Sequence, residues 1–284
     1  MLGLVTGCER LLSIQDPVAD DGRIGDAGGD VGITDAGPAA SSPILLSEVV
    51  VTPNAGEMIE LVNTSTQAVD LSTYYLSDSG NYYRLPVDPT HTTVDSTDFI
   101  VKFPTGATIA GHTAITVAVD MPANFMTAYG KLPSFSLVDG SMTTIVVNGT
   151  PNLTNGGEPI ILFQWDGSSD LVHDVDIMLV GAAMGANGLS SKSRLLQDGP
   201  DPGSQPSQYA VDANTIKPQN ATPGNGQSTK RLLLEDGHET HAGTGNGPSG
   251  DDETSEDTAM TWDGAAGNAF TAPTPGQVPA ALLR

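Results

Sequence analysis

The pattern closest to a catalytic metal site is the short run His238-Glu239-Thr240-His241. The zinc-protease motif requires two histidines four positions apart on a helix, so that both imidazoles face one ion. Here the spacing is three, and glycines at 237, 243, 245 and 247 disfavour a helix around the run. His238 and His241 are therefore only weak candidates for metal ligands.

An acidic run follows these histidines and offers oxygen ligands, with Asp251, Asp252 and Glu253 at its start. Carboxylate oxygens suit Ca²⁺, which is a hard cation. The simpler interpretation is a solvated stretch of charge. We therefore expect no cofactor, and Ca²⁺ on Asp251, Asp252 and Glu253 is the alternative that this run leaves open.

Two further carboxylates, Asp174 and Asp176, stand two positions apart in a stretch that predicts a β-strand. On a strand they would face the same side, as the paired carboxylates of a glycosidase require. The sequence contains no G-x-S-x-G elbow, no S-x-x-K pair and no phosphate-binding G-x-x-x-x-G-K-[ST] loop. No catalytic residue can be assigned, and we expect a protein that is not an enzyme.

The only cysteine of the 284 residues is Cys8, which directly follows Leu4-Val5-Thr6-Gly7. This run resembles the bacterial lipobox, in which small residues precede a cysteine that receives a diacylglycerol. Only seven residues precede Cys8 and none is basic, which is less than a secretory signal requires. We expect residues 1–8 to be a lipoprotein signal remnant with Cys8 lipidated. An ordinary N-terminal cysteine is the alternative.

Residues 9–42 are rich in Asp, Gly, Ala and Pro and poor in aromatic residues. Such a stretch buries too little apolar surface to offset its ordering entropy, so it predicts a disordered acidic linker. The whole chain has 34 acidic and 11 basic residues, a formal charge of −23, which repels phosphate backbones and disfavours a nucleic-acid partner.

From residue 43 onward, short apolar or alternating runs are separated by turn residues. In the run from Ala114 to Val119, the residues Ile115, Val117 and Val119 fall on one face of a strand, which should be core. One helix is expected over the segment PANFMTAYG, where Pro122 suits the first turn and Gly130 the stop. Many short strands at this spacing predict a β-sandwich or barrel.

Several of these segments resemble the lamin tail domain family. They are Ser47-Glu48-Val49, then MIELVNTSTQAVDLSTYYLSD at 58–78, LTNGGEPIILFQWDGSSDLVHDVDI at 153–177, and a closing Thr274-Pro275-Gly276. The clear match spans residues 44–181 and implies an all-β, immunoglobulin-like β-sandwich. The core positions expected from both readings are Leu61, Val69, Leu71, Leu76, Ile160 and Leu162.

The resemblance also implies an aspartate at Asp174 without known catalysis, and structural roles for Glu60 and Asn63. Residues 182–280 should complete the sandwich with long loops, so that one domain covers residues 43–280. We expect a noncatalytic binding or scaffolding module of the bacterial cell envelope, anchored to the membrane through Cys8, with a protein or polysaccharide ligand. A secreted metal-dependent hydrolase, such as a nuclease or phosphatase, or an accessory domain of one, is the alternative.

Overall fold

The computed structural model describes residues 42–89, 94–181, 192–203, 205–212, 220–235, 237–241, 245–264 and 269–284. Cys8 and the rest of the expected signal remnant lie outside these residues, as does the expected linker up to residue 41. In the described part of the chain, no helix is both long enough and apolar enough to cross a bilayer.

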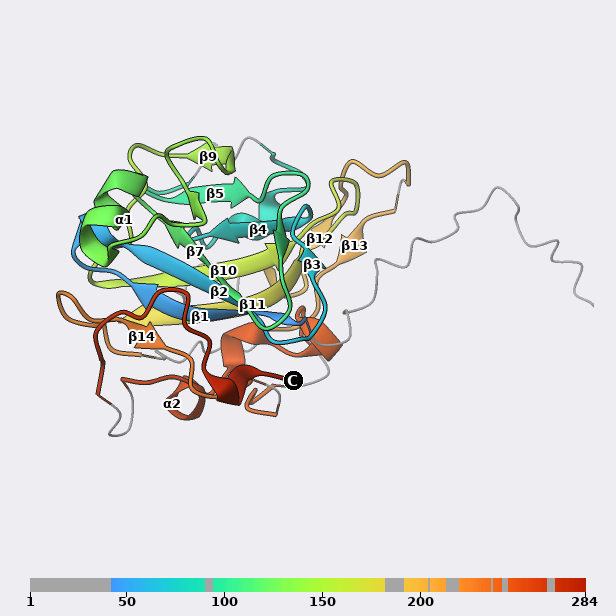
Figure 1. The fold of residues 1–284 in the computed structure, drawn as a ribbon. Helices are drawn as coiled ribbons and strands as arrows, with labels where there is room; N and C mark the ends of the chain where they lie inside the picture. The colour runs from blue at the N-terminus through green and yellow to red at the C-terminus, as the bar shows by residue number, and fades with distance from the viewer. Residues whose placement is uncertain are drawn as a thin grey trace, which may run out of the picture. The chain divides into compact units, whose positions relative to one another are not determined.

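Two five-stranded sheets form the frame of the fold (Figure 1). The first sheet has the order β14 (Thr229–Lys230), β1 (Ile44–Val50), β2 (Met58–Asn63), β7 (Ala114–Ala118) and β8 (Phe135–Ser136). The second has the order β11 (His173–Gly181), β10 (Gly157–Gln164), β4 (Tyr74–Ser77), β5 (Phe99–Lys102) and β9 (Thr143–Val147). Neighbouring strands are antiparallel except β7 and β8.

Smaller elements join these strands. They are the pairs β3 (Val69–Asp70) with β6 (Thr108–Ile109) and β12 (Leu196–Gln197) with β13 (Ser207–Gln208), the helices α1 (Pro122–Tyr129) and α2 (Thr258–Thr261), and the 3₁₀ turns η1 (Asn54–Gly56), η2 (Tyr82–Arg84), η5 (Pro248–Gly250), η6 (Glu253–Ser255) and η7 (Ala280–Leu282). The expected all-β, immunoglobulin-like sandwich is confirmed.

The main apolar core lies where side chains of both sheets meet. Leu46 and Leu61 of the first sheet pack in one cluster with Leu76, Ile160 and Leu162 of the second. Along β2, β4 and β10 the side chains that enter this cluster alternate with side chains that do not, because successive residues of a strand face opposite sides. The expected core positions are confirmed, with Val69 and Ile115 only partly buried at its margin.

A second apolar cluster covers the other face of the second sheet. Ile161 and Phe163 of β10 pack there with Tyr82 and Tyr83 of η2 and with Tyr209, which follows β13. Both faces of β10 and β11 are therefore covered, and the two strands are buried over nearly their full length. This double cover explains the nearly continuous apolar run from Pro159 to Phe163.

The expected helix is present as α1, with Pro122 in its first turn and Gly130 in the left-handed conformation (φ +72°) at its end. A residue without a Cβ adopts this conformation at low cost, so glycine ends the helix here. Phe125 is the buried residue of the helix and packs with Val50, Met58 and Ala118.

Candidate functional site: an acidic pocket beside strand β11

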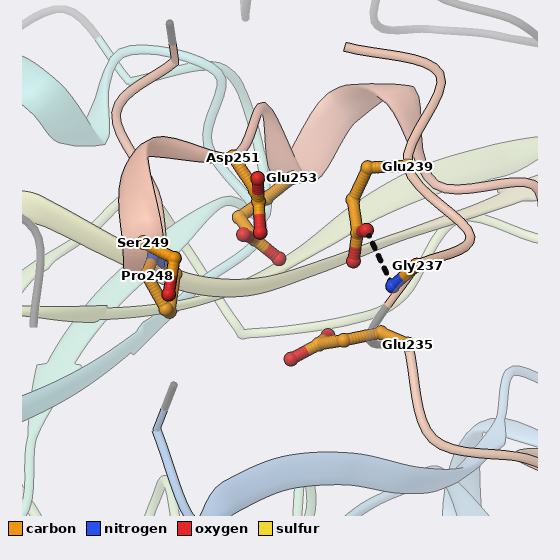
Figure 2. Close-up of a pocket in the computed structure, with 7 residues that line it drawn as sticks. All are labelled: Glu235, Gly237, Glu239, Pro248, Ser249, Asp251 and Glu253. Carbon is orange, nitrogen blue, oxygen red and sulfur yellow. Dashed lines mark hydrogen bonds between the residues drawn. The ribbon is translucent and has the colours of Figure 1, made fainter. Parts of the chain in front are cut away.

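A pocket of about 220 Å³ lies beside the sandwich and is bordered by four acidic residues. Its lining residues are Glu235, Gly237, Glu239, Pro248, Ser249, Asp251 and Glu253. Figure 2 shows the carboxyl groups of Glu235, Glu239 and Glu253 directed into the same space.

Two segments of the C-terminal region form the walls of this pocket. The peptide N–H of Thr240 donates to Ser255 O (3.1 Å), and the N–H of Asp257 donates to His238 O (2.9 Å). These bonds flank an antiparallel bridge between Glu239 and Glu256, so the histidine run is not helical, as its flanking glycines predict.

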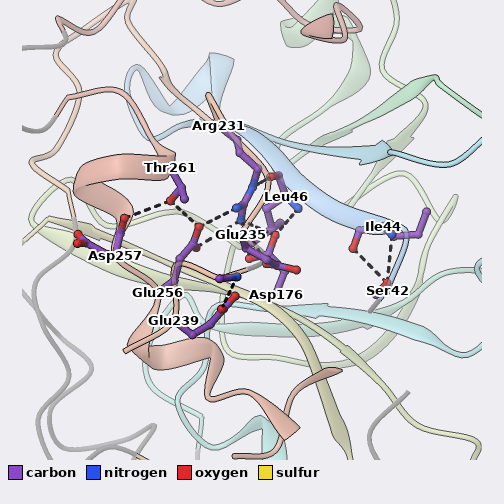
Figure 3. Close-up of polar contacts among 11 residues, drawn as sticks. Ser42, Ile44, Leu46, Asp176, Arg231, Glu235, Glu239, Glu256, Asp257 and Thr261 are labelled. Atoms are coloured by element: carbon purple, nitrogen blue, oxygen red, sulfur yellow. Dashed lines mark hydrogen bonds and ion pairs between the residues drawn. The ribbon is translucent and has the colours of Figure 1, made fainter. Parts of the chain in front are cut away.

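The floor of the site is a buried charge network around Arg231, directly after β14 (Figure 3). Its Nη2 donates to both carboxylate oxygens of Asp176 on β11 (2.8 Å each), and its Nη1 donates to Glu256 Oε1 (2.7 Å). Leu46 contributes its peptide N–H to Asp176 Oδ2 (2.6 Å), and its carbonyl accepts from Arg231 Nε (2.8 Å). The guanidinium also lies 4.7 Å from the ring centroid of Trp262. The network thus joins strands of both sheets to the C-terminal region.

The carboxyl groups of Glu235 and Glu253 also lie near this network, but they do not hydrogen-bond to Arg231. Glu235 Oε2 is 3.9 Å from Arg231 Nη2, beyond hydrogen-bond distance, and no described group hydrogen-bonds to this buried oxygen. Oxygens of Asp176, Glu235 and Glu253 all lie within 4.8 Å of one another. All three residues are buried.

Burial and mutual repulsion dominate the electrostatics of these groups. Loss of solvation, followed by the charge of Asp176, raises the pKa of Glu235 well above its usual value. Loss of solvation and the charge of Glu235 do the same to the pKa of Glu253. The pKa of Asp176 is raised to about 7 by burial, although Arg231 opposes the shift. The site therefore holds more carboxyl groups than one guanidinium can balance, and burial favours the neutral, protonated form of Glu235 and Glu253.

The structure separates the metal candidates taken from the sequence. Glu253 belongs to the buried carboxylate group and Asp251 lines the pocket. The Asp252 carboxylate accepts from the N–H and hydroxyl of Thr254 (3.0 and 2.5 Å) and so caps the turn η6. His238 is half-buried and His241 is exposed. Among the described residues, neither histidine belongs to a group of three closely spaced candidate ligands.

Asp174 and Asp176 do not form the paired carboxylates that their spacing predicts. The pairing of β10 with β11 shifts register between these positions, where Leu162 faces Asp176 and Phe163 faces Asp174. Because a bulge breaks the alternation of faces, the two carboxylates enter different networks. The expectation of a same-side pair is wrong.

Asp174 instead forms an ion pair with the buried ammonium group of Lys192. Lys192 Nζ donates to Asp174 and to the hydroxyl of Tyr82 (2.5 Å), and it is 3.6 Å from Asp212 Oδ2. The Tyr82 hydroxyl donates to Asp174 Oδ1 (2.5 Å). This network fastens the segments around 192 and 212 onto the outer face of the second sheet.

Another group of three aspartates meets at the β12–β13 hairpin, formed by Asp170, Asp198 and Asp201. The Asp170 carboxylate already accepts from the peptide N–H groups of Gly199 (2.6 Å) and Ser207 (2.9 Å). Its oxygens therefore shape the hairpin.

Glu48 and Glu60, in the motif segments of the sandwich, hold the closing Thr274-Pro275-Gly276 segment. The Glu48 carboxylate accepts from Thr274 N (2.9 Å) and from the hydroxyl of Ser228 (2.5 Å). The Glu60 carboxylate accepts from Gly276 N and from the hydroxyl of Ser47 (2.9 Å). The expected structural role of Glu60 thus gains a specific partner.

Asn63 serves the turn that follows β2, as expected. Its amide nitrogen donates to Gln67 O (2.6 Å) and Ile109 O (3.1 Å), and its side-chain oxygen accepts from Ser65 N (3.0 Å).

Sequence reasoning missed Arg231 and Glu235 as members of the site. Their spacing of four residues in STKRLLLED was the available signal, but this spacing indicates an ion pair only on a helix, and the segment predicts a strand. The chemistry that the assembled groups offer is binding of a cation by oxygen ligands.

Comparison with known proteins gives a family for this fold. The family model described as Lamin Tail Domain matches residues 37–177, about half of the chain. No curated protein matches the sequence. Among solved structures, the chain is similar to a DUF4876 family protein from Bacteroides thetaiotaomicron, with 12% identity and a TM-score of 0.43 over 84% of this chain and 75% of that one. From the family match, the chain belongs to the lamin tail domain family.

Proposed function

We propose that this protein is a noncatalytic binding or scaffolding module of the bacterial cell envelope, anchored to the membrane by a lipid on Cys8. Its ligand would be a protein or a polysaccharide. The charge of −23 disfavours nucleic acid as a partner.

The observation that carries the noncatalytic role is the use of the buried charged side chains. Arg231 joins Asp176 to Glu256, Lys192 joins Asp174 to Asp212, and Glu48 holds the segment at Thr274. Each of these networks fastens a C-terminal segment to the sandwich. Side chains engaged in this way support a rigid display surface, which agrees with membership of the lamin tail domain family.

The anchor is supported by the sequence around Cys8 and is tested by labelling. Cells expressing the protein from its own gene are grown with radioactive palmitate, beside cells carrying Cys8→Ser. We expect label on the wild-type protein and none on the variant, because the acyl chains attach at this cysteine. A wild-type protein that takes up no label would remove the anchor from the account.

A metal-dependent hydrolase is the second candidate, favoured only by the group of buried carboxylates beside an open pocket. Purified protein is assayed with nucleic acid and with a phosphate ester in the presence of added Ca²⁺ or Zn²⁺. Turnover that disappears in the double variant His238→Ala, His241→Ala, or in Glu253→Gln, would establish this candidate. The noncatalytic proposal predicts no turnover above the buffer rate.

A further inference from the structure

The carboxylates of Asp176, Glu235 and Glu253 come from three separate segments of the chain. Asp176 belongs to β11, Glu235 follows β14, and Glu253 begins η6. Their oxygens lie within 4.8 Å of one another. Ca²⁺ binds its oxygen ligands at about 2.3 to 2.6 Å. Two ligand oxygens on opposite sides of the ion are therefore separated by about twice that length, roughly 4.6 to 5.2 Å. The spacing therefore matches one ion shared by all three residues.

A second and independent observation is the unsatisfied oxygen of Glu235. Only 4% of this residue is exposed, and its Oε2 has no hydrogen-bond partner among the described groups. A buried polar atom in this state is costly, because it has left water without gaining a hydrogen bond. In Figure 2 the Glu235 carboxyl group is directed into the pocket, toward the space that Glu253 also faces.

Arg231 approaches Glu235 Oε2 to 3.9 Å with its Nη2 but does not hydrogen-bond to it. Its Nη2 is bound to both oxygens of Asp176, its Nη1 to Glu256, and its Nε to Leu46 O. The buried group of Asp176, Glu235, Glu253 and Glu256 thus contains four carboxyl groups beside one guanidinium. A divalent cation placed among Asp176, Glu235 and Glu253 would displace the protons that burial favours there and balance most of the charge of the ionised carboxylates.

Gly247 leaves the space that the side chain of Glu253 occupies in this arrangement. A Cβ built on Gly247 would collide with the side chain of Glu253, including its Oε1 and Cδ. Because Gly247 carries no side chain, the Glu253 carboxyl group can lie across the loop and reach the other two carboxylates.

We propose that Asp176, Glu235 and Glu253 bind one Ca²⁺ ion at the base of the acidic pocket. The choice of Ca²⁺ follows from the ligands, which are all carboxylate oxygens, whereas Zn²⁺ favours nitrogen and sulfur. Mg²⁺ requires near-ideal octahedral geometry and gives up its waters reluctantly. The open side of the pocket leaves space for the waters that complete the six to eight ligands of Ca²⁺.

Bound Ca²⁺ would tie the C-terminal region to the sandwich, since β11 lies in the second sheet and the other two ligands lie outside both sheets. This inference does not depend on the lipid at Cys8. Failure of either proposal leaves the other standing.

Isothermal titration calorimetry on the full chain, freed of metal with a chelator, tests the site. We expect one Ca²⁺ per chain, not displaced by Mg²⁺ in excess. Glu235→Gln and Glu253→Gln, which keep the side-chain shape, should each weaken binding by about tenfold or more.

The matched control is Glu57→Gln, because Glu57 is also buried, with one oxygen that lacks a hydrogen bond from any described residue, but lies outside the pocket. The Glu57→Gln protein should bind Ca²⁺ with the affinity of wild type. No saturable binding at one ion per chain, or unchanged binding in both variants, would overturn the site.

Amide hydrogen exchange on the wild-type protein locates the ion without any substitution, in case a variant does not fold. Ca²⁺ should slow exchange in residues 237–241 and 252–257, and leave β5 and β9 unchanged. Unchanged exchange in both C-terminal segments would overturn the proposal just as decisively.

Discussion

At the residue scale, this protein buries more carboxyl groups than it can neutralise with basic residues. Arg231 and Lys192 each bind two or more acidic residues, whereas Glu57 and Glu235 keep a buried oxygen without a hydrogen bond from any described residue. Burial then raises the pKa of these carboxyl groups, because a charge is poorly solvated inside the fold. The ionisation state of single glutamates should therefore affect stability near neutral pH.

Glu57 gives the clearest pH prediction, because burial raises its pKa from 4.5 to about 8. The folded protein then holds a proton that the unfolded chain releases, so the resulting stability is fully present below pH 4.5 and is lost as the pH rises through 8. In Glu57→Gln this side chain stays neutral at every pH. Between pH 4.5 and pH 8 the variant should therefore lose less free energy of unfolding than wild type, by at least about 1.4 kcal/mol, the equivalent of one pKa unit.

Urea unfolding of both proteins below pH 4.5 and above pH 8 measures this difference. Other buried acids contribute the same trend to both proteins, so only the difference between the two counts. Equal losses of stability in wild type and variant would mean that Glu57 is ionised in the folded state.

At the element scale, the closing segment near residue 275 is held by strands that lie more than 200 residues earlier. Glu48 of β1 accepts from the peptide of Thr274, and Glu60 of β2 accepts from that of Gly276. Lys131 Nζ also donates to Pro275 O. Glu48 and Glu60 therefore serve as hydrogen-bond acceptors for the C-terminal backbone.

Glu48→Gln should release this segment. Gln keeps one carbonyl oxygen but loses the negative charge and the second acceptor oxygen, Oε2, to which the N–H and hydroxyl of Thr274 also donate. Loss of a charged hydrogen-bond acceptor typically costs about 1.5 to 3 kcal/mol. Limited proteolysis should then cut within residues 271–284 sooner than in wild type. The control is Glu158→Gln, a buried glutamate whose partner among the described residues is the nearby Thr154, and its cleavage should be unchanged. Equal cleavage in Glu48→Gln and wild type would show that Glu48 does not hold the segment.

The strands and α1 could be predicted from the sequence because their signals are local. Alternation at Ile115, Val117 and Val119 and the glycine stop at Gly130 each lie within a few residues. The acidic site could not be predicted, because Asp176, Arg231 and Glu253 are far apart in the chain and meet only through loop paths that carry no periodic pattern. The bulge between Asp174 and Asp176 was equally invisible, since no Gly or Pro marks it.

At the scale of the whole molecule, the chain is a lamin tail domain whose C-terminal region is fastened to the sandwich by buried charged side chains. The match to the family ends at residue 177, yet Lys192, Arg231 and Glu256 after it complete the networks of β11. The described part of the C-terminal region is therefore integral to the fold. Such a module suits display at a membrane surface, which is the role that we propose.

Fractionation of the native cells tests this role most directly. We predict that the protein sediments with membranes and is released by detergent, and that Cys8→Ser moves it into the soluble fraction. Wild-type protein found in the soluble cytosol, with Cys8 still reacting as a free thiol, would contradict the account.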